Sequence, residues 1–258
     1  MRRLSPFLFR GKTMPIFNKS NFFTLSALLA LNSANADVYI NATRVIYPAE
    51  KREITFTVGN GAATKSLIQT WVDEGNPKDT PDNSKAPFIL TPPLAVIGAQ
   101  KTQNIRMSYS GEQALPSNKE SLFWINVLEA PKNTQDPNEL RISLRTRIKL
   151  FYRPSGLEMK PEEAPQKIGW QMDHINGKWV LSAKNNSPYF ITLSQIKIKT
   201  NEFTGIAKLS PQNSMISPGQ DVEFALTPDG TPTESGIKFS TINDYGGTSD
   251  YSATLMPH

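Results

Sequence analysis

The feature that most constrains the fold is the segment at residues 139–154. At its start, aliphatic side chains alternate with basic or polar ones: Leu140, Arg141, Ile142, Ser143, Leu144 and Arg145. A period of two places the aliphatic side chains on one face of a strand. The segment continues through aliphatic and aromatic residues to Pro154 and is about three times the usual strand length. An ordinary long sandwich strand is one interpretation. The other is that its outer half is a surface for pairing with another chain.

Shorter strand-like runs recur on both sides of this segment, with Gly, Pro, Asn or Asp in most of the gaps. The predicted runs are residues 38–47, 53–58, 66–72, 88–90, 104–109, 121–128, 168–172, 178–183, 190–199, 222–226, 237–242 and 252–256. Asn176-Gly177 lies between two of them and indicates a tight hairpin, because both residues tolerate positive φ. No stretch has a convincing 3.6-residue apolar period, so the sequence predicts an all-β protein built from sandwiches.

Residues 1–36 are predicted to be a secretory signal. A basic stretch ends at Lys19, an apolar run follows at residues 22–31, and Ala34-Asn35-Ala36 has the small-x-small cleavage pattern. Met14 is an alternative start, because the stretch from Met14 onward is a complete signal by itself. A membrane-anchoring helix is the competing interpretation, but the apolar run is about ten residues and a bilayer needs about 20. We therefore expect an exported, soluble mature protein.

The mature chain is long enough for two domains of about 100 residues each. Residues 154–165 contain three prolines and one glycine, which is typical of a linker. The sequence thus predicts a first domain at residues 37–154, a linker at 155–165 and a second domain at 166–258.

The charge of the chain is concentrated in its first residues. Residues 1–36 hold five basic and no acidic residues, so subtracting five from 28 leaves 23 basic residues against 23 acidic ones. A mature body without net charge gives no reason to expect a nucleic-acid partner. The chain has no cysteine, so disulfides and thiolate metal sites are excluded.

The residues that catalysis or metal binding requires are scarce. The two histidines are His174, beside the predicted hairpin turn, and the C-terminal His258, and no nucleophile motif accompanies them. Asp73, Glu74 and Asp79 surround Gly75-Asn76-Pro77 and are interpreted as a solvated turn rather than a Ca²⁺ site. We expect no catalytic residue, metal, cofactor or small-molecule substrate. A secreted all-β carbohydrate-active enzyme remains the alternative, because a carboxylate pair has no local sequence signature.

Six motifs in a fixed order resemble one family. They are A-T-R-V-I-Y-P (42–48), T-P-P (91–93), E-S-L-F-W-I-N-V (120–127), R-I-K-L-F-Y-R-P (147–154), N-N-S-P-Y-F (185–190) and I-N-D-Y-G-G (242–247). Together they resemble the immunoglobulin-like periplasmic chaperones of the chaperone–usher pathway, which deliver pilus subunits in Gram-negative bacteria. The set spans nearly all of the predicted mature chain.

The resemblance implies two immunoglobulin-like β-sandwich domains set at an angle, with a cleft between them. It implies that Arg44 and Lys149 bind the C-terminal carboxylate of a pilus subunit. Leu140, Ile142 and Leu144 match the alternating side chains that the family donates to a groove in the subunit.

The resemblance also implies that Glu120, Arg153 and Asp244 form a charged cluster between the domains, although Asp244 also fits ordinary turn chemistry. The short connection at residues 129–139 and the absence of cysteine resemble the short-loop subclass.

The implied location is the periplasm and the implied partners are pilus subunits and an outer-membrane usher. An exposed aliphatic edge needs cover, so we expect weak self-association of the client-free protein. A structural pilin is disfavoured by two complete domains and by the lack of a cysteine pair.

Overall fold

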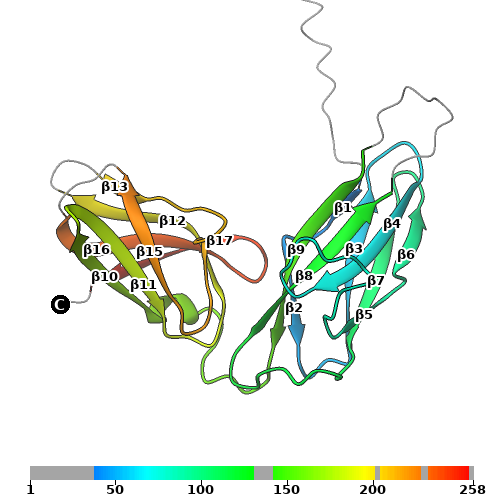
Figure 1. Cartoon of the computed structure of the whole chain (residues 1–258), viewed down its shortest axis with the longest axis horizontal. Coiled ribbons are helices and arrows are strands. Elements are labelled where there is room, and N and C mark those ends of the chain that lie inside the picture. The colour runs from blue at the N-terminus through cyan, green and yellow to red at the C-terminus, as the bar shows by residue number, and fades with distance from the viewer. Residues whose placement is uncertain (1–37, 131–141, 201–203, 228–231, 256–258) are drawn as a thin grey trace, which may run out of the picture. The chain divides into compact units, whose positions relative to one another are not determined.

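The computed structural model describes residues 38–130, 142–200, 204–227 and 232–255, and these ranges form strands almost throughout (Figure 1). Within them the one helical element is a 3-10 turn, η1 (Ala164–Lys167). The strands belong to two sandwiches, one on each side of the proline-rich stretch. The predicted all-β class and the two immunoglobulin-like domains are therefore confirmed.

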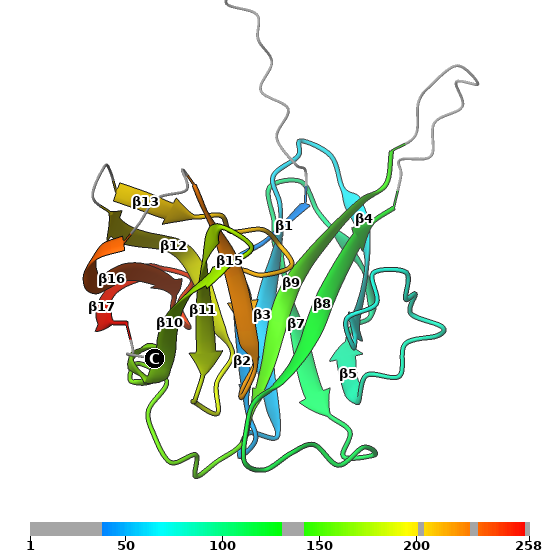
Figure 2. The same ribbon diagram turned by 60° about the vertical axis from the view of Figure 1, so that its left-hand side comes forward.

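The first sandwich has two layers (Figure 2). One sheet has the order β1-β3-β7-β5, with β1 (Val38–Ile40), β3 (Glu53–Asn60), β7 (Thr102–Tyr109) and β5 (Phe88–Thr91). The other has the order β2-β9-β8-β4-β6, with β2 (Arg44–Pro48), β9 (Leu144–Arg153), β8 (Ser121–Glu129), β4 (Ser66–Asp73) and β6 (Leu94–Ile97). Alternate side chains of both sheets fill the space between them; Val58, Ile68, Ile105, Met107, Ile125 and Leu150 are fully buried there.

The predicted strand at residues 38–47 is divided in the structure. β1 pairs with β3 in one sheet, whereas β2 pairs with β9 in the other, so the chain changes sheets at residues 41–43. The inward-facing positions change from even to odd numbers across these residues: Val38, Ile40 and Ala42 pack against the core before the change, and Val45 and Tyr47 after it.

The change of sheets leaves β9 with two different halves. Its inner half, residues 149–153, pairs with β2 in parallel and with β8 antiparallel. Its outer half, residues 144–148, pairs with β8 alone among the described strands. One side of the outer half therefore carries backbone groups without a strand partner in the described ranges.

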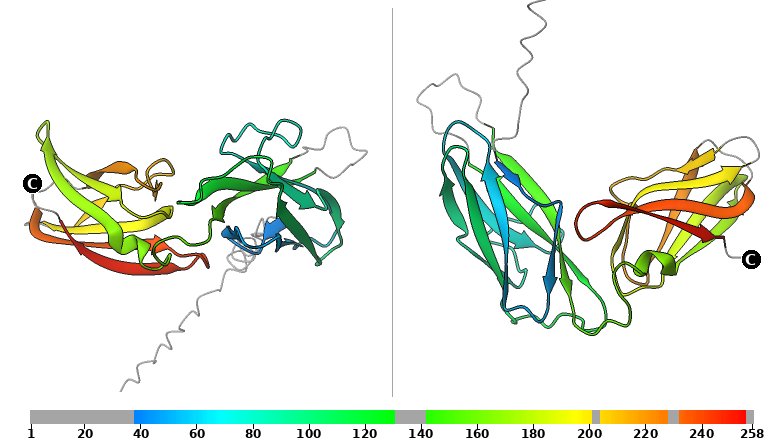
Figure 3. Two further views of the ribbon diagram at one scale, coloured as in Figure 1. Left: turned by 90° about the horizontal axis from the view of Figure 1, so that it is seen from below. Right: turned by 180° about the vertical axis from the view of Figure 1, so that it is seen from behind.

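The second sandwich contains the remaining strands, seen from two further sides in Figure 3. They follow the order β10 (Ile168–Ile175), β11 (Lys178–Asn185), β15 (Asp221–Thr227), β13 (Thr204–Ala207), β12 (Ile191–Thr200), β16 (Pro232–Ile242) and β17 (Thr248–Thr254), and β14 (Met215–Ile216) pairs with β12. A parallel bridge between Trp170 and Leu255 joins the two ends of this order.

The predicted hairpin at Asn176-Gly177 is confirmed. Asn176 has a φ of 51° and Gly177 a φ of 78°, and Ile175 pairs directly with Lys178 across the turn. Two central residues with positive φ are what a tight two-residue hairpin requires.

Candidate functional site

The two cations that the motifs single out are neighbours in the folded chain. Arg44 begins β2, and the parallel register places it directly beside Lys149 in β9. Arg44 donates a hydrogen bond from Nη1 to the carbonyl oxygen of Ile242 at 2.9 Å, and Lys149 Nζ donates to Thr192 Oγ1 at 3.4 Å. The guanidinium of Arg44 also lies over the Phe151 ring, 5.6 Å from its centroid. The structure therefore brings together two cations that lie 105 residues apart.

The surroundings of these cations favour an anion. Burial, and after it the positive charge of Arg44, together lower the pKa of Lys149 to about 8. Burial also lowers the pKa of Arg44, against the attraction of Asp244 and Glu120. Arg44 Nε is buried without a hydrogen-bond partner in the structure, and no described carboxylate forms an ion pair with either cation. Two partly desolvated charges side by side would both be stabilised by a bound carboxylate.

Of the predicted donor residues, Leu144 begins β9 and Ile142 lies two residues before it. Ile142 is 63% exposed and Leu144 is 50% exposed, whereas Ile148 and Leu150, further along the same face, are buried in the core. The face thus changes from solvent-exposed to core-facing within one strand. Leu140, the third predicted donor, lies outside the described residues.

The predicted charged cluster is also assembled. Arg153 donates from Nε to Glu120 Oε1 at 2.7 Å, and from Nη1 and Nη2 to the two carboxylate oxygens of Asp244 at 2.7 and 2.9 Å. The backbone amide of Phe190 donates to Glu120 Oε2 at 2.9 Å. Burial raises the pKa of Glu120 despite the opposing charge of Arg153. Burial alone would lower the pKa of Arg153, but its bonds to Asp244 and the charge of Glu120 outweigh it and raise the pKa. The cluster therefore links Glu120, the residue before β8, and Arg153, the last residue of β9, to two segments of the second sandwich.

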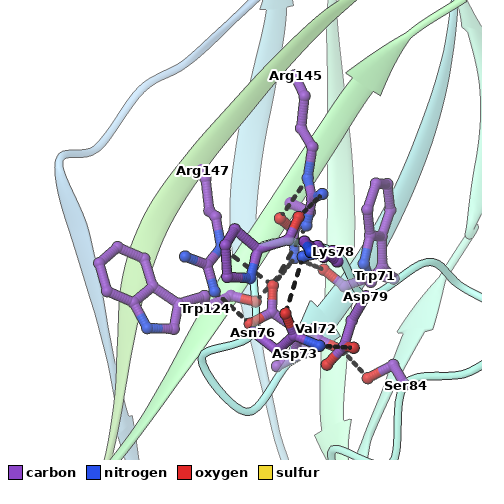
Figure 4. A network of polar contacts seen from close by, with 12 residues as sticks. Trp71, Val72, Asp73, Asn76, Lys78, Asp79, Ser84, Trp124, Arg145 and Arg147 are labelled. Carbon is purple, nitrogen blue, oxygen red and sulfur yellow. Dashed lines mark hydrogen bonds and ion pairs between the residues drawn. The ribbon is translucent and has the colours of Figure 1, made fainter.

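The interpretation of Asp73 as part of a solvated turn is wrong. Its side chain has no exposed surface and accepts hydrogen bonds from Arg147, Asn126 and the Gly75 amide (Figure 4). Glu74 is exposed, as expected for a turn. The missed signal was the alternation of Arg145 and Arg147 in the 139–154 segment, which places both cations on the face opposite Leu144.

The chain resembles known chaperones along nearly its whole predicted mature length. Residues 37–158 match the family model described as the pili and flagellar-assembly chaperone, PapD N-terminal domain. Residues 163–253 match the pili assembly chaperone PapD, C-terminal domain. No helix within the described ranges is long and apolar enough to cross a membrane.

Curated relatives and a solved structure agree with the family match. The probable fimbrial chaperone YadV of Escherichia coli K12 is 33% identical over 231 residues, covering 87% of this chain and 92% of the relative. The chaperone protein FimB/FhaD of Bordetella pertussis Tohama I is 36% identical over 229 residues, covering 86% and 90%. The crystal structure of the YadV chaperone aligns with a TM-score of 0.72 at 32% identity, covering 85% of this chain and all of that one. With both of its sandwiches matched, this chain belongs to the PapD family of pilus-assembly chaperones.

Proposed function

We propose that this pilus-assembly chaperone captures subunits in the periplasm by lending them the outer half of β9 together with the residues just before it. In this proposal Arg44 and Lys149 hold the C-terminal carboxylate of the subunit, and Leu140, Ile142 and Leu144 enter a groove in it. The observation that carries the proposal is the position of the two neighbouring cations, which lie at the point where β9 no longer has β2 beside it and pairs with β8 alone. A subunit strand anchored there has the free edge directly ahead of it.

The anchor supplies both affinity and register. A charge-assisted hydrogen bond contributes about 1.5–3 kcal/mol net. A slip by one residue would turn every side chain of a paired strand to the wrong face, so a fixed end specifies which subunit residues meet the donor face. Each aliphatic side chain buried in the groove adds about 1.5–3 kcal/mol before the cost of ordering is subtracted.

The remaining parts of the proposal follow from the sequence and the family. The signal predicted at residues 1–36, outside the described ranges, supports export to the periplasm. We propose domain limits of 37–154 and 166–258 with a connection at 155–165, and a charged cluster of Glu120, Arg153 and Asp244 that fixes the two domains.

The subunit is passed to an outer-membrane usher, and the chaperone acts without enzymatic turnover. The client-free protein covers its edge by weak self-association. The alternative of a carbohydrate-active enzyme is not supported.

The anchor is tested by replacing each cation separately. Arg44→Ala and Lys149→Ala are each expected to abolish protection of a co-expressed pilus subunit from proteolysis, while the circular dichroism spectrum of the chaperone is unchanged. Lys65→Ala, at an exposed lysine of the same sandwich, is the matched control and should protect normally. Protection at the wild-type level by either anchor variant would exclude the carboxylate anchor.

A further inference from the structure

Asp73 lies at the end of β4 on the outer face of the five-stranded sheet, and its carboxylate is fully buried there. It accepts hydrogen bonds from Arg147 Nε at 3.0 Å and from Arg147 Nη2, and Arg145 Nη2 lies 3.4 Å from the same carboxylate. Asn126 Nδ2 and the Gly75 amide each donate to it at 2.7 Å. This one carboxylate therefore gathers side chains from β9 and β8 and the backbone of the turn after β4.

Two tryptophans form the sides of this cluster. The Arg145 guanidinium lies over the Trp71 ring, 4.6 Å from its centroid, and the Arg147 guanidinium lies over Trp124 at 4.3 Å. Figure 4 shows both arginines extending from β9 to Asp73 with a tryptophan on either side. Arg145 is held twice more, through Nε to Asn126 Oδ1 at 2.8 Å and through Nη1 to the Pro77 carbonyl at 2.7 Å. Both guanidinium planes are thereby fixed in orientation.

The position of the two arginines along β9 gives the cluster its significance. Arg145 and Arg147 both belong to residues 144–148, the half of β9 that has β8 as its sole described strand neighbour. Their side chains reach across β8 to β4 and so connect this half to a second strand. A strand edge with a partner on one side only is prone to fray and to exchange partners, and these side-chain bonds replace part of the missing restraint.

An ionic cluster is not needed to stabilise a sheet face. Replacing a buried ion pair by apolar side chains of similar volume is often neutral or stabilising, because charges are costly to desolvate. Such clusters specify geometry when they fix donors and acceptors in one arrangement. Burial alone would raise the pKa of Asp73, but the hydrogen bonds from Arg147, Asn126 and Gly75 outweigh it, and the pKa is lowered. Asp73 is thus an ionised hub with a defined set of donors.

We propose that Asp73 is a positioning residue for subunit capture: through Arg145 and Arg147 it holds the outer half of β9 extended, so that Leu144 and Ile142 are presented to the subunit before it arrives. The proposal rests on the capture function proposed above and extends it to a residue that touches neither the subunit carboxylate nor the groove. A pre-ordered edge loses less conformational entropy on binding. Without the Asp73 carboxylate, the outer half of β9 would still be present, but each binding subunit would have to bring it into the extended conformation.

The first test uses the client-free protein and needs no subunit. In Asp73→Asn, the amides of residues 144–148 that bond to β8 are expected to exchange with solvent about tenfold faster than in the wild type. The amides of residues 149–153, which have strands on both sides, and those of β3 and β7 should exchange at wild-type rates. Arg145→Met is the milder second variant, because it leaves the Arg147–Asp73 pair in place, and a smaller increase confined to the same residues is expected.

The second test measures the dissociation rate of a captured subunit. Asp73→Asn is expected to release it about tenfold faster. Ile105→Val, a core change in the opposite sheet chosen to lower the thermal midpoint similarly, should release it at the wild-type rate. Glu53→Gln removes the exposed ion pair with Arg106 and should change neither exchange nor release. Unchanged exchange at residues 144–148 in both network variants overturns the inference, as does faster exchange with an unchanged release rate.

The two proposals fail in different ways. If the wild-type protein captures no subunit, or if Ile142→Asp captures as well as the wild type, then β9 is not the donor strand and the capture function fails. If capture requires Ile142 but Asp73→Asn behaves like Ile105→Val, the function stands and Asp73 has a structural role only. The exchange measurement separates these cases, because it reports on the edge with no client present.

Discussion

The fold disfavours the positive charge of Lys149, whereas the proposed ligand, a carboxylate, would favour that charge. Burial and the neighbouring Arg44 lower its pKa to about 8, whereas an unperturbed lysine has a pKa of about 10.4. A bound carboxylate would raise the pKa again, because opposite charges stabilise each other. Subunit binding and protonation of Lys149 are therefore thermodynamically linked.

This linkage predicts that subunit affinity falls as the pH rises through about 8, where the free chaperone loses the Lys149 proton. Lys149→Arg keeps its charge at every pH in this range and should remove the dependence. The measurement is the dissociation constant between about pH 7 and about pH 10.

The stability of the client-free protein has the opposite trend. The unfolded chain holds the Lys149 proton up to a higher pH than the folded chain, so the free energy of unfolding should increase between about pH 8 and about pH 10.4. A flat affinity profile would exclude Lys149 as a ligand of the carboxylate.

The sequence singled out individual residues when they lie within a recognisable motif. It misjudged a residue whose hydrogen-bond partners are distant in the chain. Arg44 and Lys149 each occupy a recognisable motif, and strand pairing places them side by side. Asp73 precedes Glu-Gly-Asn-Pro, which has every local mark of a solvated turn. Its partners Arg145 and Arg147 lie 72 and 74 residues further along the chain. Nothing local distinguishes a carboxylate that is solvated from one that distant arginines bury.

At the scale of one element, β9 is shorter than its sequence pattern and consists of two halves with different strand neighbours. The alternation begins at Leu140 and the observed strand at Leu144, so the sequence predicted the face correctly but not where the described strand begins. The difference between the two halves depends on β2, which ends its pairing at Lys149. Pairing of this kind is a tertiary property, and periodicity in one segment contains no information about it.

The donor face can be tested within this element by comparing adjacent residues. Ile142→Asp is expected to abolish subunit capture, because a carboxylate in an apolar groove is costly. Ser143→Asp places the same charge one residue further on, facing the other way, and should have little effect. Capture is measured by affinity pull-down of a co-expressed subunit. In sedimentation of the client-free protein over a concentration series, Ile142→Asp should also shift any self-associated species toward monomer. Equal losses from the two variants would show that the proposed register is wrong.

At the scale of the whole molecule, Arg153 joins residues that are far apart in the sequence. Glu120 lies 33 residues before it and Asp244 lies 91 residues after it. The family motifs predicted all three residues, because each lies in a recognisable motif. Local patterns alone would not have selected Asp244, which lies in a turn of ordinary composition.

Arg153→Met is expected to destabilise the protein by about 3 kcal/mol, because it leaves the Glu120 carboxylate buried without a countercharge. The double variant Glu120→Gln with Arg153→Met should recover part of that loss. Arg106→Met, which breaks the exposed pair with Glu53, is the matched control and should cost less than about 1 kcal/mol. The free energy of unfolding is measured by urea denaturation. A loss in Arg153→Met no larger than in the control would mean that the cluster does not stabilise the fold.

The change of sheets between β1 and β2 leaves the outer half of β9 with β8 as its one strand neighbour in the described ranges. Continuing the parallel register of β2 backwards from Arg44 and Lys149 would set residues 41–43 beside residues 146–148, and that short extension would cover three of the five residues of the outer half of β9. A variant with such a continuous first strand would complete its own domain and gain stability from the added hydrogen bonds. Under the proposed capture function, the same variant would offer a subunit less free edge to pair with. A more stable client-free domain would then be a weaker chaperone, and the path of three residues, 41–43, would set the balance between the two.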